Sequence, residues 1–121
     1  MKILIVDDSK AMRMIVKRIL RQTDIGDHET VEAEDGEQGV KQVNVENPDL
    51  VLSDWNMPNM TGLEFLKAVR DDGNQVKFGF ITTEASAKMR DIAKEAGAHF
   101  LIAKPFTPES FEESIKPALG M

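Results

Sequence analysis

Short apolar runs alternate with helical patterns along this chain, and no other feature of the sequence restricts the fold as strongly. Each run is four to six residues long. Such runs are typical of strands that are buried on both faces, as in parallel sheets, although length alone does not exclude a helix. They occupy residues 3–6, 50–53, 76–81 and 100–103, and a weaker strand of alternating character is predicted at residues 30–33.

The segments between these runs have the spacing of amphipathic helices. After the first run, apolar residues fall at i, i+3, i+4, i+7 and i+8, and this stripe comprises Met12, Ile15, Val16, Ile19 and Leu20. Arg13 and Lys17 are then expected on the faces that turn away from the core. The first structural unit is therefore predicted to be a strand, an acidic turn and a helix.

Capping signals mark the ends of the other helices. The starts are indicated by Asp35 with Gln38, by Thr61 with Glu64, and by Thr107 with Pro108. Gly97 is typical of a residue that follows the last turn of a helix. Pro117 lies late in the final helix, where it lacks a backbone donor and should kink or end that helix.

The strand and helix patterns alternate five times with short connections. This alternation indicates an α/β domain with a parallel sheet covered on both sides. We therefore predict a single doubly wound (βα)5 sandwich of three layers with a five-stranded parallel sheet. No domain boundary, repeat or low-complexity tract interrupts the pattern, so residues 1–121 are expected to form one domain.

Composition excludes several classes of function. The formal net charge is −6, so the basic footprint that nucleic-acid binding requires is missing. No apolar run is long enough to span a bilayer, and the N-terminal apolar run is too short for a signal peptide. The chain contains no cysteine, which excludes disulfides and thiolate chemistry. We expect a cytoplasmic, monomeric protein that binds neither nucleic acid nor membranes.

Polar residues with complementary chemistry follow four of the five predicted strands. Asp7 and Asp8 follow the first, Asp54 ends the third, Thr82 follows the fourth and Lys104 follows the fifth. Ligands of such sheets bind outside the carboxyl ends of the strands, so these side chains should share one edge. Packed carboxylates repel one another unless a cation is present, and Mg²⁺ prefers hard oxygen ligands of this kind.

This set of residues predicts phosphoryl chemistry. A carboxylate such as Asp54 can attack phosphorus and form an aspartyl phosphate. Transfer of this type needs positioning and charge neutralisation more than covalent help from the protein. Lys104 would neutralise one phosphoryl oxygen, and Thr82 would donate a hydrogen bond to another.

Each residue also has a simpler interpretation when it is considered alone. Asp54 could be a turn former, the segment from Asp7 to Ser9 a helix cap, Thr82 a second cap, and Lys104 an exposed loop lysine. The joint position of these residues at strand ends favours the shared acidic metal site.

The same residues carry a resemblance to a known family. Asp7-Asp8, the segment from Ser53 to Gly62, Thr82 and the segment from Lys104 to Phe106 resemble the receiver domain of two-component response regulators, and within it the stand-alone regulators of chemotaxis. The resemblance covers the whole chain. It implies the strand order 2-1-3-4-5, a non-enzymatic signalling role, and transfer of phosphate from a histidine kinase to Asp54.

Further roles are also implied by the resemblance. Asp7, Asp8, Asp54 and the backbone carbonyl of Asn56 would bind Mg²⁺. Lys104 and Pro105 would be joined by a cis peptide bond. Asn56 and Glu84 would tune the rate of dephosphorylation, and the bulk of Thr83 would slow access to the site.

The sequence departs from the family pattern on its expected output face. Leu101 stands where receivers usually carry Tyr or Phe, and Phe100 is expected on the opposite strand face. The positions that contact the flagellar switch in motor-binding regulators are here Ser86, Ala87, Arg90 and Ser114. The output partner could therefore be a flagellar switch or another protein that binds the face containing Leu101.

Two alternatives stay open. The chain could act as a phosphate sink that draws phosphoryl groups from a kinase without an output partner. It could instead be a small phosphohydrolase with an Asp nucleophile, although such enzymes use Asp-x-Asp and the second acidic position is Asn56 in this chain.

Overall fold

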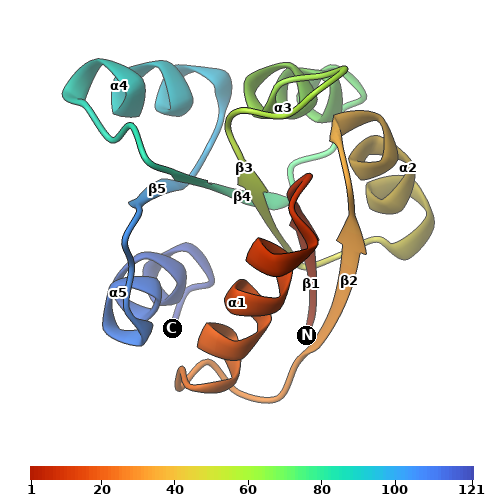
Figure 1. The fold of residues 1–121 in the computed structure, drawn as a ribbon. Coiled ribbons are helices and arrows are strands. Elements are labelled where there is room, and N and C mark those ends of the chain that lie inside the picture. The colour runs from red at the N-terminus through yellow and green to blue at the C-terminus, as the bar shows by residue number, and fades with distance from the viewer.

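The computed structural model describes residues 1–121 and contains one sheet of five parallel strands (Figure 1). The strands are β1 (Lys2–Val6), β2 (Glu29–Ala33), β3 (Leu50–Asp54), β4 (Lys77–Thr82) and β5 (Phe100–Ala103). They lie in the order β2-β1-β3-β4-β5. The predicted fold class and strand order are therefore confirmed.

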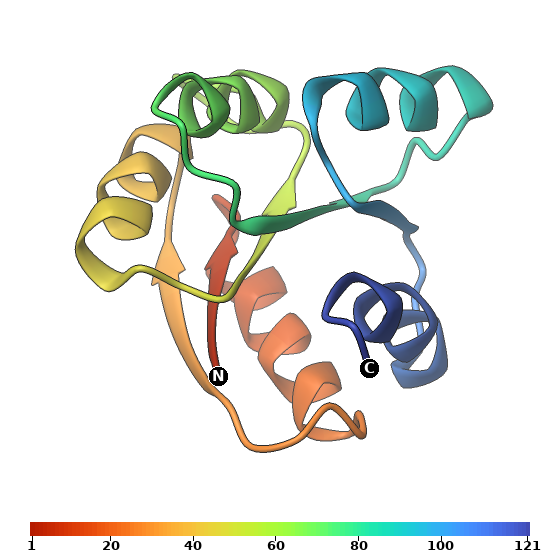
Figure 2. The same ribbon diagram turned by 180° about the vertical axis from the view of Figure 1, so that it is seen from behind.

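Five helices cover the two faces of this sheet. They are α1 (Lys10–Arg21), α2 (Gly36–Glu46), α3 (Gly62–Asp71), α4 (Ala87–Ala96) and α5 (Pro108–Ala118). Figures 1 and 2 show α1 and α5 together on one face, and α2, α3 and α4 on the other. No helix combines the length and the apolar character that a membrane span requires.

The interior strand β1, which lies between β2 and β3, explains why the apolar runs are continuous. Leu4 and Val6 belong to the core beneath α2, α3 and α4, whereas Ile3 and Ile5 belong to the core beneath α1 and α5. Successive residues of a strand point to opposite faces, so a strand covered on both sides must be apolar throughout. The polar residue that ends such a run is therefore the first one free to reach the edge of the sheet.

The predicted helix ends are largely confirmed. Thr61 and Glu64 form a reciprocal capping box at the start of α3, and the Asp35 side chain accepts a hydrogen bond from the Gln38 backbone at the start of α2. Gly97 ends α4 with φ of 104°, a conformation that favours glycine. Pro117 lies one residue before the last residue of α5, so that helix ends where predicted.

Helix α1 is rotated from its predicted orientation. Its buried residues are Arg13, Val16 and Leu20, and Arg13 is only 7% exposed, whereas Ile15 is 41% exposed. The predictions that Arg13 faces solvent and that Ile15 lies in the core are therefore wrong. The physical reason is that Arg13 finds acceptors on neighbouring elements, at the Asp7 carbonyl and the Glu32 carboxylate, and these compensate the burial of its charge.

Candidate functional site

Three carboxylates meet at the carboxyl ends of β1 and β3. Asp7, Asp8 and Asp54 each offer one oxygen atom, and these atoms all lie within 4.8 Å of one another. The topology brings them together, because β1 and β3 are neighbours and Val6 pairs with Ser53 immediately before the two acidic positions. Asp7 is buried, Asp54 is half-buried and Asp8 is exposed, so the cluster opens to solvent on one side.

Burial and crowding change the acidity of this cluster. Burial, assisted by the nearby charge of Asp54, raises the pKa of Asp7 to about 6, although a hydrogen bond from the Ser9 backbone opposes the rise. Burial also raises the pKa of Asp54, against the opposing charge of Lys104. Carboxylates that resist ionisation in this way suit a divalent cation, which would compensate their charge. Their hard oxygen atoms could hold Mg²⁺.

Hydrogen bonds fix the main chain around Asp54. The Trp55 backbone donates to Asp54 Oδ1 at 2.8 Å, and the Ser53 hydroxyl donates to the Asp54 carbonyl at 2.8 Å. The Asn56 backbone amide also lowers the pKa of Asp54, which places this exposed loop residue beside the carboxylate. The Asp54 carboxylate is therefore held at the carboxyl end of β3, at the edge of the sheet.

Gly62 is a site residue that sequence reasoning missed. Its backbone donates to the Trp55 carbonyl at 2.8 Å. A Cβ atom at this position would lie 2.2 Å from the Asp54 carbonyl oxygen, so only glycine allows α3 to begin this close to the acidic strand end. The signal available in the sequence was a glycine at the first helical position, immediately after the N-cap Thr61.

Lys104 lies where the sequence predicted it, beside Asp54. Its Nζ is 3.7 Å from Asp54 Oδ1, and both side chains are largely shielded from solvent. The Lys104 backbone donates to the Thr82 carbonyl at 2.8 Å, which extends the pairing of β4 and β5 by one step. The predicted cis peptide bond between Lys104 and Pro105 is confirmed.

Thr82 is the last residue of β4 and is fully buried. Its hydroxyl oxygen accepts a hydrogen bond from the Glu84 backbone at 3.2 Å, which leaves the hydroxyl proton free to be donated. The N-cap of α4 is Ser86, so the alternative in which Thr82 caps this helix is wrong. The cap interpretation of the segment from Asp7 to Ser9 is confirmed for Ser9, which caps α1, whereas Asp7 and Asp8 also belong to the carboxylate cluster.

A groove of about 400 Å³ lies beside the cluster. It is lined by Met12, Ile15, Thr83, Lys104, Pro105 and Phe106. Thr83 and Glu84 are both exposed in the loop after β4, and Thr83 lines this groove together with Lys104. The exposed Ile15 is part of this groove rather than of the core.

The sequence of this chain matches a known family. The family model of the response regulator receiver domain matches residues 3–116. This chain belongs to the response regulator receiver domain family. The receiver has its acidic cluster, lysine and buried threonine at the ends of adjacent strands, as described above.

Several relatives of this receiver are named as chemotaxis proteins. The chemotaxis protein CheY of Pseudomonas aeruginosa is 42% identical over 96% of this chain and 94% of its own length. The chemotaxis protein CheY-3 of Vibrio cholerae is 41% identical over 95% of this chain and 88% of its own length. Among solved structures, the chemotaxis response regulator CheY4 of Vibrio cholerae superposes with a TM-score of 0.85 at 36% identity, covering 98% of each chain.

The α4–β5 face of the receiver combines a buried leucine with basic side chains, whereas the cluster is acidic. Leu101 is buried in the core beneath α4, whereas Phe100 packs with the core beneath α5, as the strand alternation predicted. Arg90 Nη1 donates to the Leu101 carbonyl at 3.0 Å, so a hydrogen bond connects α4 to β5. A groove of about 320 Å³ between these two elements is lined in part by Arg90, Lys94 and His99.

Proposed function

We propose that residues 1–121 form one receiver domain of a response regulator, and that this domain accepts a phosphoryl group on Asp54. One observation carries the proposal: three carboxylates lie within 4.8 Å of one another, with the Lys104 ammonium 3.7 Å from Asp54 Oδ1. The family itself accounts for phosphorylation and Mg²⁺ in general terms. The roles of individual residues in this chain are our assignment.

The reaction that fits these residues is transfer from a phosphohistidine of a histidine kinase. A carboxylate oxygen of Asp54 forms a bond to phosphorus while the phosphorus–nitrogen bond breaks, and the electron pair remains on the imidazole, which takes up a proton. Lys104 pairs with one phosphoryl oxygen, and the Thr82 hydroxyl donates a hydrogen bond to another.

The metal assigned to the site is Mg²⁺, held by the carboxylates of Asp7, Asp8 and Asp54 and the backbone carbonyl of Asn56. When bound, it supplies the positive charge that offsets the phosphoryl oxygens. Burial is the main cause of the raised pKa values of Asp7 and Asp54, and a cation beside these carboxylates would compensate it by favouring their ionised form.

Residues around the cluster adjust the lifetime and access of the phosphoryl group. Asn56 and Glu84 are exposed beside the site, where they can influence an attacking water molecule and so tune dephosphorylation. Thr83 and Pro105 line the groove that leads to Lys104, so the bulk of Thr83 restricts entry. The protein promotes only its own phosphorylation and dephosphorylation, and is a signalling protein rather than an enzyme.

The setting that we propose is chemotaxis, in the cytoplasm, with a chemotaxis histidine kinase as donor. The chemotaxis names of relatives at 42% and 41% identity support this setting. A monomer would signal by presenting the α4–β5 face around Leu101 to a flagellar switch or another output protein.

A phosphate sink is the second candidate for the same site. The observation that favours it is the position of Leu101, which is buried where the family usually carries an aromatic side chain, with Arg90 bonded to its carbonyl. A pull-down that compares beryllofluoride-activated protein with untreated protein separates the two candidates. A partner retained only by the activated form supports signalling, and a flagellar switch protein in that fraction contradicts the sink.

Intact-mass measurement tests the phosphoacceptor assignment. Incubation with acetyl phosphate and Mg²⁺ should add one phosphoryl group to the wild type and none to Asp54→Asn. The matched control is Asp91→Asn, an exposed acid on α4, which should be modified as the wild type is. A wild type that stays unmodified contradicts the proposal. Continued turnover of a phosphate ester would instead support the phosphohydrolase alternative.

A further inference from the structure

Arg13 is a buried arginine at the base of the acidic cluster. Its Nη1 donates to the Asp7 carbonyl at 2.6 Å, and its Nε donates to Glu32 Oε1 at 2.9 Å. The guanidinium group is rigid and always charged, so its two donors hold these two acceptors in a fixed relation. Arg13 therefore connects the main chain of the loop after β1 to a side chain of β2.

Together with other hydrogen bonds, these contacts restrain Asp7 at several of its atoms. The Asp7 backbone donates to the carbonyl of Ala33 at 3.1 Å, and Ala33 is the neighbour of Glu32 on β2. The Asp7 carboxylate accepts a hydrogen bond from the Ser9 backbone at 2.9 Å. With Arg13 on its carbonyl, Asp7 is held at its amide, at its carbonyl and at one carboxylate oxygen. Few rotations remain that could carry its carboxylate away from Asp8 and Asp54.

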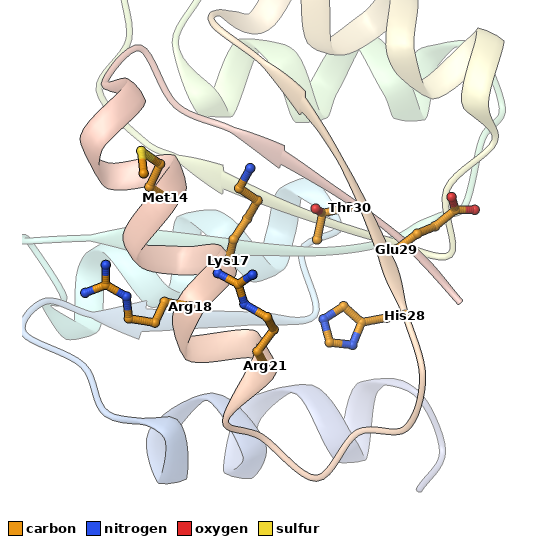
Figure 3. Close-up of a pocket in the computed structure, with 7 residues that line it drawn as sticks. All are labelled: Met14, Lys17, Arg18, Arg21, His28, Glu29 and Thr30. Atoms are coloured by element: carbon orange, nitrogen blue, oxygen red, sulfur yellow. The ribbon is translucent and has the colours of Figure 1, made fainter.

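Lys17 shares the same acceptor but not the same role. Its Nζ lies 3.0 Å from Glu32 Oε2, so Glu32 is bonded by both basic residues. The Lys17 side chain is 31% exposed, against 9% for that of Arg13. Figure 3 shows Lys17 with Arg18 and Arg21 along an open groove between α1 and the start of β2. Lys17 makes no hydrogen bond to Asp7, which makes it a matched control for Arg13.

We infer that Arg13 is a positioning residue for the metal site, which it serves by fixing the Asp7 main chain so that the Asp7 and Asp8 carboxylates are preset for a divalent cation. The inference rests on the proposed function. Three crowded carboxylates repel one another, and the loop that carries two of them would relax outward without an anchor. Residues that orient metal ligands typically change metal affinity roughly 10- to 100-fold when they are replaced.

Mg²⁺ titration of two variants tests this role. Trp55, the only tryptophan, donates its backbone N–H to Asp54, so its fluorescence reports on the site. Arg13→Met should weaken Mg²⁺ binding at least about tenfold. Lys17→Met, which also removes a cation bonded to Glu32, should stay within about twofold of the wild type because an exposed ion pair contributes little.

The kinetics of phosphorylation by acetyl phosphate separate positioning from a general loss of structure. In Arg13→Met, the Mg²⁺ concentration for half-maximal rate should rise by roughly the same factor as the dissociation constant, with a maximal rate close to that of the wild type. A merely destabilised protein would show a lower maximal rate at an unchanged half-saturation. That second pattern overturns the inference, as does equal weakening of Mg²⁺ binding in Lys17→Met.

A second variant covers the case in which Arg13→Met does not fold. Arg13→Lys keeps the charge beside Glu32 but lacks the fork that reaches the Asp7 carbonyl as well. Folded Arg13→Lys with severalfold weaker Mg²⁺ binding supports the inference, and wild-type binding overturns it. If the wild type is phosphorylated on Asp54 while the Arg13 variants bind Mg²⁺ normally, only this inference fails. If the wild type binds no Mg²⁺, the proposed function fails with it.

Discussion

The Lys104 ammonium lies 3.7 Å from Oδ1 of Asp54, although the two side chains come from the ends of β5 and β3, with β4 between these strands. Both side chains are largely shielded from water, so their mutual attraction is stronger than that of a surface pair. Lys104 offsets part of the effect by which burial raises the pKa of Asp54. In the proposed function, Lys104 would therefore stabilise the ionised Asp54 nucleophile as well as the incoming phosphoryl group.

Replacing Lys104 by Met should separate these roles from metal binding. Phosphorylation by acetyl phosphate should slow roughly 100-fold, because one group that stabilises the developing charge is lost. Mg²⁺ affinity should stay equal or become tighter, because a cation that repels the metal has been removed. Rapid-mixing fluorescence of Trp55 measures both quantities, and Lys88→Met on the exposed side of α4 is the control. Loss of Mg²⁺ binding in Lys104→Met would contradict this division of roles.

The raised pKa of Asp7 predicts a specific pH dependence of metal binding. The Asp7 carboxyl has a pKa of about 6, so a proton competes for it at mildly acidic pH. Mg²⁺ affinity should be nearly constant above pH 7 and fall roughly tenfold at pH 5, because about nine-tenths of such groups are then protonated. Fluorescence titrations at several pH values measure it. Constant affinity down to pH 5 would contradict this combination of a raised pKa and a ligand role for Asp7.

The same pKa predicts how the metal-free protein responds to pH. The pKa of the Asp7 carboxyl is about 6 in the folded state and 3.8 in the unfolded state, so the folded protein holds this proton more tightly. The resulting contribution to stability is complete below pH 3.8 and is lost as the pH rises through 6. Asp7→Asn should therefore raise the free energy of unfolding at pH 7.5 without Mg²⁺ by about 1 to 3 kcal/mol. Urea denaturation measures the gain. Asp8→Asn, at an exposed position, should give a smaller one, and no gain in Asp7→Asn would contradict the account.

We expect the Thr83 side chain to restrict access of small molecules to Asp54 and Lys104. It is exposed, and it lines the groove that contains Lys104 and Pro105. Thr83→Ala should speed phosphorylation by acetyl phosphate about threefold, a barrier change below 1 kcal/mol. Mg²⁺ affinity should not change, because Thr83 is not among the assigned ligands, and this serves as the internal control. A slower rate in Thr83→Ala would show that its side chain assists the phosphoryl group instead.

Much of the fold and of the candidate site follows from local sequence. Uniformly apolar strands such as residues 3–6 are covered on both sides, so the polar residue that ends such a run must lie at the sheet edge. This rule brought Asp54 and Lys104 to one place, and the structure has them there. The strand order itself came from the resemblance, since the apolar pattern does not say which strands are neighbours.

The failures concern contacts between distant segments. Helical periodicity placed Ile15 inside and Arg13 outside, because it counts apolar residues and does not detect acceptors on other elements. Arg13 is buried only because Glu32 of β2 and the Asp7 carbonyl lie within reach in the folded chain. The role of Gly62 was missed for the same reason, because the group that leaves no room for a side chain there is the Asp54 carbonyl at the end of β3.

Gly79 and Phe100 show how the unusual aromatic position is accommodated. They face each other in the ladder of β4 and β5, and a Cβ atom on Gly79 would lie 1.9 Å from the Phe100 ring. Gly79→Ala should therefore lower the free energy of unfolding by about 1 to 3 kcal/mol. Phe100→Leu in the Gly79→Ala background should recover part of that loss, because the smaller side chain leaves room for the methyl group. Urea denaturation of the four proteins in this cycle measures the coupling, and strictly additive losses would contradict the contact.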